Sequence, residues 1–296
     1  MALRQDGTRF RMDRFTWLNT IAMLLVCAST LYPIWYILVN SITGTEESIR
    51  SSINFWPQTI SLDSYKVVFR NSGLIDAFGI SVARTVLATA LHVFFTAMVA
   101  YGLSKRHLLG RKTYMTIGII TMLFNGGLIP TFLLFKNLQL YDQFLVYILP
   151  TMFSFYNLII FVSFFKSIPE GLEESAKVDG ANEFTVFVRI VIPCSKAVFA
   201  TLALFVGVYN WNDYFFGVIY IDNESLRPIQ TLLYKIVSEN SVGLLQQQAM
   251  NSMGKRISPD SIKFATMVVA TIPIVLVYPF LQRYFVKGLM IGSIKG

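Results

Sequence analysis

Residues 167–196 read SIPEGLEESAKVDGANEFTVFVRIVIPCSK, and this charged stretch decides the fold because a long apolar run lies on either side of it. Ser167 and Glu170 have the spacing of a capping box, and Pro169 suits the first turn of a helix. The glutamates that follow favour the positive N-terminal end of that helix. We therefore expect a short helix to begin at this point.

The rest of the stretch predicts a turn and a second helix. Leu172 and Ala176 are spaced i, i+4 and share one helix face, and Gly180 is typical of the residue that ends a helix. A second apolar stripe then runs up to Pro193, with members Phe184, Phe187, Val188 and Val191. Residues 166–196 should thus form a helix–glycine–helix loop at the membrane surface, able to transmit force to the bundle.

Composition places this loop in a membrane protein. Of 296 residues, 54% are hydrophobic and 14% are charged, against roughly 25% charged in soluble domains. Apolar runs of about 20 residues are long enough to cross a bilayer as helices. We predict an all-α polytopic protein with six spans, at about 17–39, 78–103, 113–135, 143–165, 197–221 and 263–285.

Charge sets the expected orientation. Most Lys and Arg fall in the tail 1–16, the turn 104–112, the loop 166–196 and the tail 287–296. By the positive-inside rule these segments, and hence both termini, are expected in the cytoplasm. This topology explains the net charge of +8 without nucleic acid, because no basic patch with interleaved aromatics is visible. The transmembrane domain is expected to span 17–286.

The sequence lacks the signatures of an enzyme. Gly110–Thr113 imitates the tail of a phosphate-binding Walker loop, but its upstream glycine is at the wrong distance. No nucleophile elbow and no zinc-spaced His or Cys cluster is present. We expect neither catalytic residues nor a bound metal or cofactor on this chain.

Ionisable residues within spans are costly and indicate function. Arg84 and Asp213 each lie about two turns from the external end of a span. We take them as candidates for a translocation path, together with the polar and aromatic residues Asn210, Trp211, Asn212 and Tyr214. The alternative is that Arg84 and Asp213 pair with each other or with a partner subunit. His92, in mid-span, is expected to pack within the bundle.

The loop resembles the EAA loop of the permeases of bacterial ATP-binding-cassette (ABC) importers. The resemblance is carried by Glu174-Ser175-Ala176, Asp179-Gly180-Ala181, Phe187, Ile190 and Pro193. Ser175 stands where the family usually has alanine. Ala197 stands where many members have a second proline, which weakens the kink expected before the next span. The stretches 124–150 and 278–296 are similar to the polysaccharide branch of carbohydrate-uptake permeases.

The resemblance implies the type I importer fold and several partners in the cytoplasmic (inner) membrane. These are a second, homologous permease forming a heterodimer, two ATPase subunits that bind ATP and Mg²⁺, and an external substrate-binding protein. The ATPases would contact the coupling loop through Leu172, Glu174, Ser175, Ala176, Asp179, Gly180, Ala181, Phe187 and Pro193. Within this branch we expect an acidic, alginate-type oligosaccharide as substrate.

A self-contained secondary transporter is the alternative function. Such transporters generally need carboxylates or broken helices at mid-membrane to couple an ion gradient. The spans 17–39, 113–135 and 143–165 contain no charged residue. The sequence therefore favours a permease driven by a separate ATPase.

Overall fold

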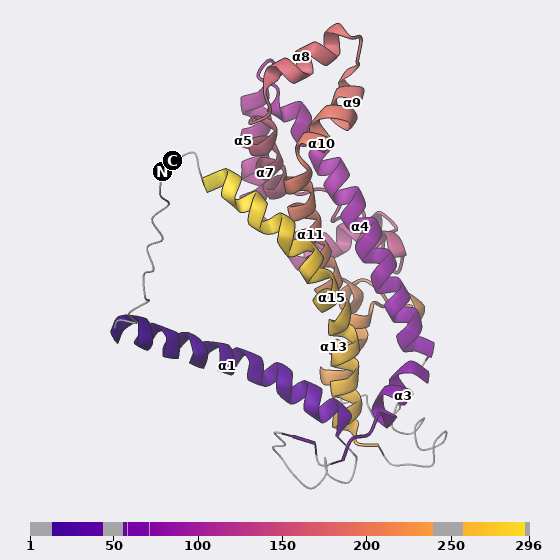
Figure 1. Cartoon of the computed structure of the whole chain (residues 1–296). Helices are drawn as coiled ribbons and strands as arrows, with labels where there is room; N and C mark the ends of the chain where they lie inside the picture. The colour runs from indigo at the N-terminus through magenta and orange to yellow at the C-terminus, as the bar shows by residue number, and fades with distance from the viewer. Residues whose placement is uncertain (1–13, 44–55, 58, 71, 239–256, 294–296) are drawn as a thin grey trace, which may run out of the picture. The chain divides into compact units, whose positions relative to one another are not determined.

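The computed structural model describes residues 14–43, 56–57, 59–70, 72–238 and 257–293 (Figure 1). Within these ranges the chain is helical, apart from its turns and one isolated antiparallel bridge between Thr43 and Ile60. The chain divides into two units, one of Met1–Val68 with Val242–Val268 and one of Phe69–Ser241 with Val269–Gly296.

The first unit is dominated by helix α1, Arg14–Ile42, whose 29 residues cover the expected span 17–39. Its side chains are mostly exposed, and only Val39, Asn40 and Ser41 are buried. The Ser41 hydroxyl bonds the Tyr65 hydroxyl at 2.7 Å, at the start of α3, Asp63–Arg70. An apolar helix left uncovered in this way is suited to lipid or to another subunit.

The second unit is organised around α4, Ser72–Ser104, the 33-residue helix that contains the expected span 78–103. It packs against α7, Phe155–Phe165, and α11, Lys196–Asn212 (Figure 1). Fully buried alanines on α4, including Ala97 and Ala100, let the neighbouring backbones approach closely. The other helical segments are α5 Arg111–Leu123, α6 Leu128–Asn137, η1 Phe144–Tyr147, α12 Phe215–Ile219, η3 Glu224–Leu226, α13 Ile229–Ser238 and α15 Pro259–Ser293.

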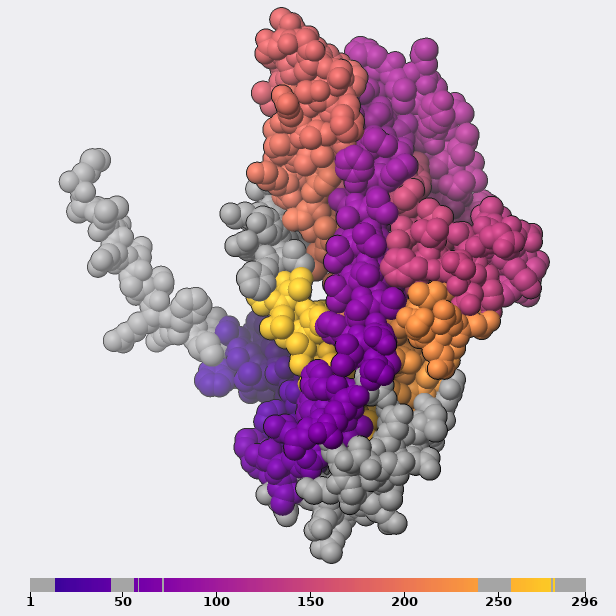
Figure 2. Space-filling view, turned by 90° about the vertical axis from the view of Figure 1, so that its right-hand side faces the viewer, coloured from indigo at the N-terminus to yellow at the C-terminus, as the bar shows by residue number. Residues whose placement is uncertain are grey.

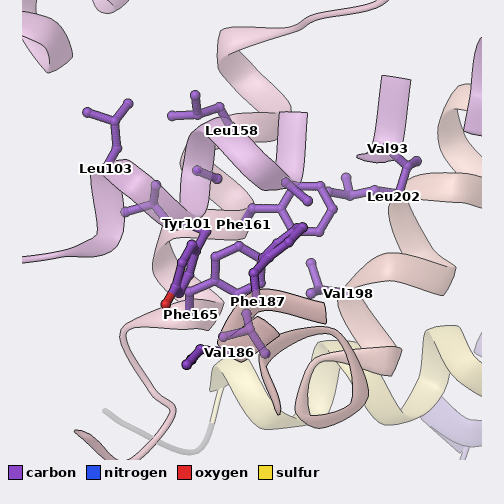
Figure 3. Close-up of a cluster of buried hydrophobic side chains, with 14 residues drawn as sticks. Val93, Tyr101, Leu103, Leu158, Phe161, Phe165, Val186, Phe187, Val198 and Leu202 are labelled. Atoms are coloured by element: carbon purple, nitrogen blue, oxygen red, sulfur yellow. The ribbon is translucent and has the colours of Figure 1, made fainter. Parts of the chain in front are cut away.

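An aromatic core joins α4 and α7 to the 166–196 loop (Figure 3). Tyr101 packs on Phe187 with ring centroids 5.4 Å apart, and Phe161 and Phe165 lie 5.4 Å apart. Phe187 is only 1% exposed, and burying one such ring contributes about 1.5–3 kcal/mol relative to exposure in water. The second half of the loop is therefore anchored in the bundle.

Three described helices, α1, α4 and α15, are long and apolar enough to cross a membrane. Two bent pairs raise the number to as many as five. The expected span 143–165 is not one helix, because residues 144–147 form a 3₁₀ turn and α7 begins at Phe155. With 11 residues, α7 is shorter than the roughly 20 that a straight crossing needs.

A glycine break divides the expected span 113–135. Helices α5 and α6 are bent by 112°, and Gly127 adopts φ 86°, a conformation that favours glycine. The Gly127 amide donates to the Asn125 side-chain oxygen at 2.9 Å, which satisfies one group freed by the break. The break falls at Asn125-Gly126-Gly127, where a glycine pair permits either a close approach of helices or a local break.

Gly118 is expected to be intolerant of a side chain. A Cβ there would overlap the Phe155 ring, so Gly118→Ala should lower the stability of the bundle by about 1–3 kcal/mol, the usual cost of overpacking. Gly102→Ala is the matched control, because nothing lies within 4 Å of its Cβ position. Thermal unfolding of the purified protein in detergent would compare them. Equal melting temperatures for both variants would contradict the packing described here.

Candidate functional site

Helix α8, Glu170–Val178, begins differently from the expectation. Pro169 occupies the N-cap position, and the Ser167 hydroxyl donates backwards to the Phe164 carbonyl at 2.6 Å. The predicted Ser167–Glu170 capping box is therefore wrong. Pro169 starts the helix because its fixed φ of −59° sets the chain direction at a position that needs no N–H donor.

The end of α8 follows the prediction. Gly180 adopts φ 82°, and its amide donates to the Lys177 carbonyl at 3.0 Å. The Ala181 amide donates to the Ala176 carbonyl at 2.9 Å. This pair of bonds is the Schellman arrangement, which requires a left-handed residue at the position that Gly180 holds.

The second half of the loop winds irregularly. Helix α9, Glu183–Val186, is capped by the Asn182 side chain and passes into a π-helical turn, Phe187–Val191, and then α10, Ile192–Cys194. A π-turn holds more residues than an α-turn and shifts the helical register. The expected apolar stripe is consequently split: Phe187 and Val191 are buried, whereas Phe184 and Val188 are exposed.

The chain bends by 84° where α11 follows α10, although Ala197 replaces the proline expected to kink it. Ser195 leaves the helical conformation at φ −112° and ψ 20°. Its amide donates to both the Val191 and Ile192 carbonyls, at 3.0 and 3.1 Å. The expectation of a weakened kink is wrong, because the chain leaves the helical conformation at Ser195, before Ala197 is reached.

Charged side chains hold α8 on the end of α4, and Figure 2 shows the loop lying beside α4. Lys105 pairs with Glu173 and lies 3.9 Å from Glu183. Lys177 pairs with Glu183 at 2.6 Å, and the Tyr101 hydroxyl donates to Glu183 at 2.7 Å. We call these five residues the loop clamp. A single exposed pair contributes little, so the clamp positions α8 as a network.

No residue of α8 is buried, and four large apolar side chains of the loop are left uncovered by the bundle. Leu172 is 47% exposed, Val178 87%, Phe184 59% and Val188 38%. Large apolar side chains left this exposed on a charged loop indicate a surface that a partner covers.

The nine predicted coupling residues occupy different surroundings. Ala176 and Ala181 are half-buried against the aromatic core, Phe187 is buried, and the others, Leu172, Glu174, Ser175, Asp179, Gly180 and Pro193, are accessible. Phe187 therefore anchors the loop. Sequence reasoning did not include Lys105 or Glu183, since the contacts that tie the clamp to the end of α4, Lys105–Glu173 and Tyr101–Glu183, join residues 68 and 82 positions apart.

Acid should loosen this loop. Hydrogen bonds from Lys177 and Tyr101 hold the pKa of Glu183 below its ordinary value of 4.5. A carboxyl group whose pKa is lower in the folded protein than in the unfolded chain stabilises the fold at any pH above its unfolded pKa. This stabilisation is lost as the pH falls through the pKa of the folded protein. A spin label at Ser175→Cys, with Cys27 and Cys194 replaced by serine, should become more mobile between pH 7 and about pH 3. Glu183→Gln should free the label already at pH 7.

Glu174→Gln is the control, because Glu174 lies on exposed α8 outside the clamp. Label mobility that stays constant down to about pH 3, or that responds equally to both substitutions, would contradict the role of Glu183.

Of the candidate path residues, Arg84 and Asp213 form a buried ion pair. Arg84 is fully buried, and its guanidinium pairs with the Asp213 carboxylate and donates to the Asp213 carbonyl at 3.0 Å. The guanidinium also lies over the Tyr147 ring, 4.4 Å from its centroid. Arg84 and Asp213 therefore pair with each other, which is the alternative that the sequence left open. A buried charge needs such partners.

The other four candidates do not form one surface. The Trp211 indole donates to the Ala270 carbonyl at 3.0 Å and is buried, as is Asn210. Asn212 is exposed, and exposed Tyr214 stacks on Tyr234 at 4.6 Å. The structure thus separates the packed residues from those that remain accessible.

His92 is buried in the bundle, as expected. It also lines a groove of about 310 Å³ between α4, α7 and α11, which includes Asn157, Tyr209 and Asn210. Sequence reasoning missed this groove because it combines residues from three helices. The sequence feature that could have pointed to the groove is a histidine, His92, within an apolar span.

A bundle of long apolar helices that carries an exposed, charged loop is typical of membrane permeases. Residues 93–291 match the family described as the binding-protein-dependent transport system inner membrane component. The chain belongs to this family. It is the non-catalytic membrane permease subunit of an ABC importer for sugars or polysaccharides.

Individual relatives are similar over nearly their whole length. The polygalacturonan/rhamnogalacturonan transport system permease protein YtcP of Bacillus subtilis (strain 168) is 42% identical, covering 93% of this chain and 96% of that protein. The arabinooligosaccharides transport system permease protein AraQ of Halalkalibacterium halodurans is 25% identical, covering 95% and 97%.

Among solved structures, a bacterial ABC transporter involved in the import of the acidic polysaccharide alginate superposes with a TM-score of 0.87. It is 29% identical and covers 93% of this chain and 98% of that chain. The type I importer permease fold expected from the resemblance is confirmed.

Proposed function

We propose that this permease imports acidic oligosaccharides and that separate ATPase subunits drive it through the 166–196 loop. The exposed apolar residues Leu172, Val178 and Phe184 carry the proposal, because they leave a surface open on a loop whose first helix is held mainly by charged contacts. An ATPase that covers this surface could move the loop, and the buried Phe187 would pass the movement into the bundle.

The relatives support an acidic substrate. Polygalacturonan and alginate are both polymers of uronic acids, and the two proteins that carry these names in their descriptions are 42% and 29% identical to this chain. Alginate-type and pectin-type oligosaccharides share the carboxylate on each uronate ring. We therefore extend the proposal from alginate to oligouronates as a class.

The partners follow from the same proposal. A second, homologous permease would complete the path, and two ATPase subunits would bind ATP and Mg²⁺. An external substrate-binding protein would dock on the segments 41–76 and 222–262, of which 44–55, 58, 71 and 239–256 lie outside the described residues. Both termini would lie in the cytoplasm. In support, a bacterial alginate ABC transporter was solved in complex with an alginate pentasaccharide-bound periplasmic protein.

Competition in uptake tests the substrate class. Membrane vesicles containing the permease, its partner subunits and its binding protein would take up a labelled trigalacturonate or alginate trisaccharide. Unlabelled oligouronates should compete, whereas the corresponding carboxyl-reduced, neutral oligosaccharides should not. Competition by neutral oligosaccharides at equal concentration would overturn the acidic assignment and leave the importer assignment intact.

A further inference from the structure

The groove beside His92 is built differently from the rest of the bundle surface. Three large rings, those of Tyr209, Phe205 and Phe153, line it while remaining 58%, 49% and 45% exposed. Polar side chains also line the groove, with Ser154 and Asn157 among them. Ligand sites combine mostly apolar walls with a few placed polar groups in this way.

Hydrogen bonds fix the orientation of the polar groups. His92 Nδ1 lies 2.5 Å from the Thr151 carbonyl, which can only accept, so Nδ1 carries the proton. In the neutral ring Nε2 is then an acceptor, and the Asn157 amide donates to it at 2.8 Å. His92 therefore holds the Asn157 side chain in one orientation. The NH₂ group of Asn157 faces His92, and its carboxamide oxygen points the other way.

The lining suits a sugar ring. Exposed aromatic faces can stack on the C–H face of a pyranose, and the Asn157 carboxamide oxygen, the Ser154 hydroxyl and the Tyr209 hydroxyl can bond its hydroxyl groups. No charged residue is among the described residues that line the groove. A carboxylate on the sugar would find no opposite charge among them.

We propose that this groove is a saccharide-contact site of the translocation path, which binds the ring face and hydroxyl groups and does not read the carboxylate. The inference rests on the proposed function and adds the site to it. It also moves the path within this chain away from Arg84, Trp211 and Asp213, which are used in packing. Of the earlier candidates, Asn210 alone lines the groove.

Substitution of Tyr209 tests the site in the complete transporter. Tyr209→Ala should raise the KM for oligosaccharide uptake about tenfold, the scale of one aromatic contact. Tyr209→Phe keeps the ring and should stay within about threefold of the parent protein. Tyr156→Ala is the matched control, since Tyr156 is 63% exposed on α7 and does not line the groove.

A competition experiment tests separately whether the groove ignores the carboxylate of the sugar. At the much higher concentrations at which the carboxyl-reduced oligosaccharides begin to inhibit uptake, Tyr209→Ala should weaken their inhibition and that of the acidic oligosaccharides by the same factor. A larger effect on the acidic ones would overturn the claim that the groove ignores the carboxylate.

Labelling distinguishes sugar from a second occupant, a helix of the partner permease. In a background with Cys27 and Cys194 replaced by serine, the Tyr209→Cys variant should react with a small maleimide in the assembled complex. A saturating oligosaccharide should protect it. If the Tyr209→Cys variant never reacts with the maleimide, the partner permease covers this position, and the proposal is overturned. Unchanged uptake by Tyr209→Ala, measured in a transporter whose parent protein is active, would also overturn the proposal. A parent protein that takes up no oligosaccharide would instead contradict the proposed function.

Discussion

Arg84→Met is expected to destabilise the permease by about 3–5 kcal/mol, the cost of leaving one member of a buried ion pair without its partner. The substitution keeps most of the volume and removes the charge, so Asp213, with 8% of its side chain exposed, stays behind as a buried carboxylate. Arg84→Lys should not recover full stability. Its point charge cannot bond both the Asp213 carboxylate and the Asp213 carbonyl, as the guanidinium does.

Melting temperatures in detergent would measure this effect. The double variant Arg84→Met with Asp213→Asn should be more stable than Arg84→Met alone, because it removes the unpaired charge. Arg106→Met is the control: Arg106 pairs with Glu170 at 3.2 Å with 78% of its side chain exposed, and such pairs contribute about 1 kcal/mol or less. An Arg84→Met variant as stable as the parent would show that the pair is not buried in the folded bundle.

Leu172→Asp should disconnect the permease from its ATPase without unfolding it. Leu172 is 47% exposed and α8 has no buried residue, so the bundle itself loses almost nothing. A central apolar contact in an interface is worth about 2 kcal/mol or more, which corresponds to roughly 30-fold weaker ATPase binding. Phe184→Asp should act in the same way from the other side of the glycine turn.

Co-purification of the ATPase and ATP-driven uptake would both report this loss. Leu109→Asp is the control, since Leu109 is 90% exposed in the turn that follows α4 but lies outside the loop. Normal ATPase binding by Leu172→Asp and Phe184→Asp, with melting temperatures unchanged, would place the docking surface elsewhere.

Local signals in the sequence predicted local structure well. Gly180 ends α8 because the left-handed conformation belongs to a single residue, and Asn125-Gly126-Gly127 breaks a span for a similar reason. Composition alone predicted α1, α4 and α15, because crossing a bilayer requires long apolar helices.

Arrangements that depend on residues far apart in the chain were beyond local reasoning. The Arg84–Asp213 pair joins positions 129 apart, and the sequence offered this pairing only as an alternative to a place in the translocation path. The π-turn Phe187–Val191 begins at a residue that is buried in the aromatic core. A pattern at α-helical spacing cannot anticipate the change in register that divides Phe184 from Phe187.

The source of energy for transport is the most direct test of the coupling loop. Proteoliposomes would hold the two permeases with or without the ATPase subunits, and the binding protein and oligouronate would be supplied outside. Uptake should require the ATPase subunits and internal Mg-ATP, should be lost with Leu172→Asp, and should ignore an imposed proton or sodium gradient. Uptake driven by such a gradient in the absence of the ATPase subunits would contradict the account and identify a secondary transporter.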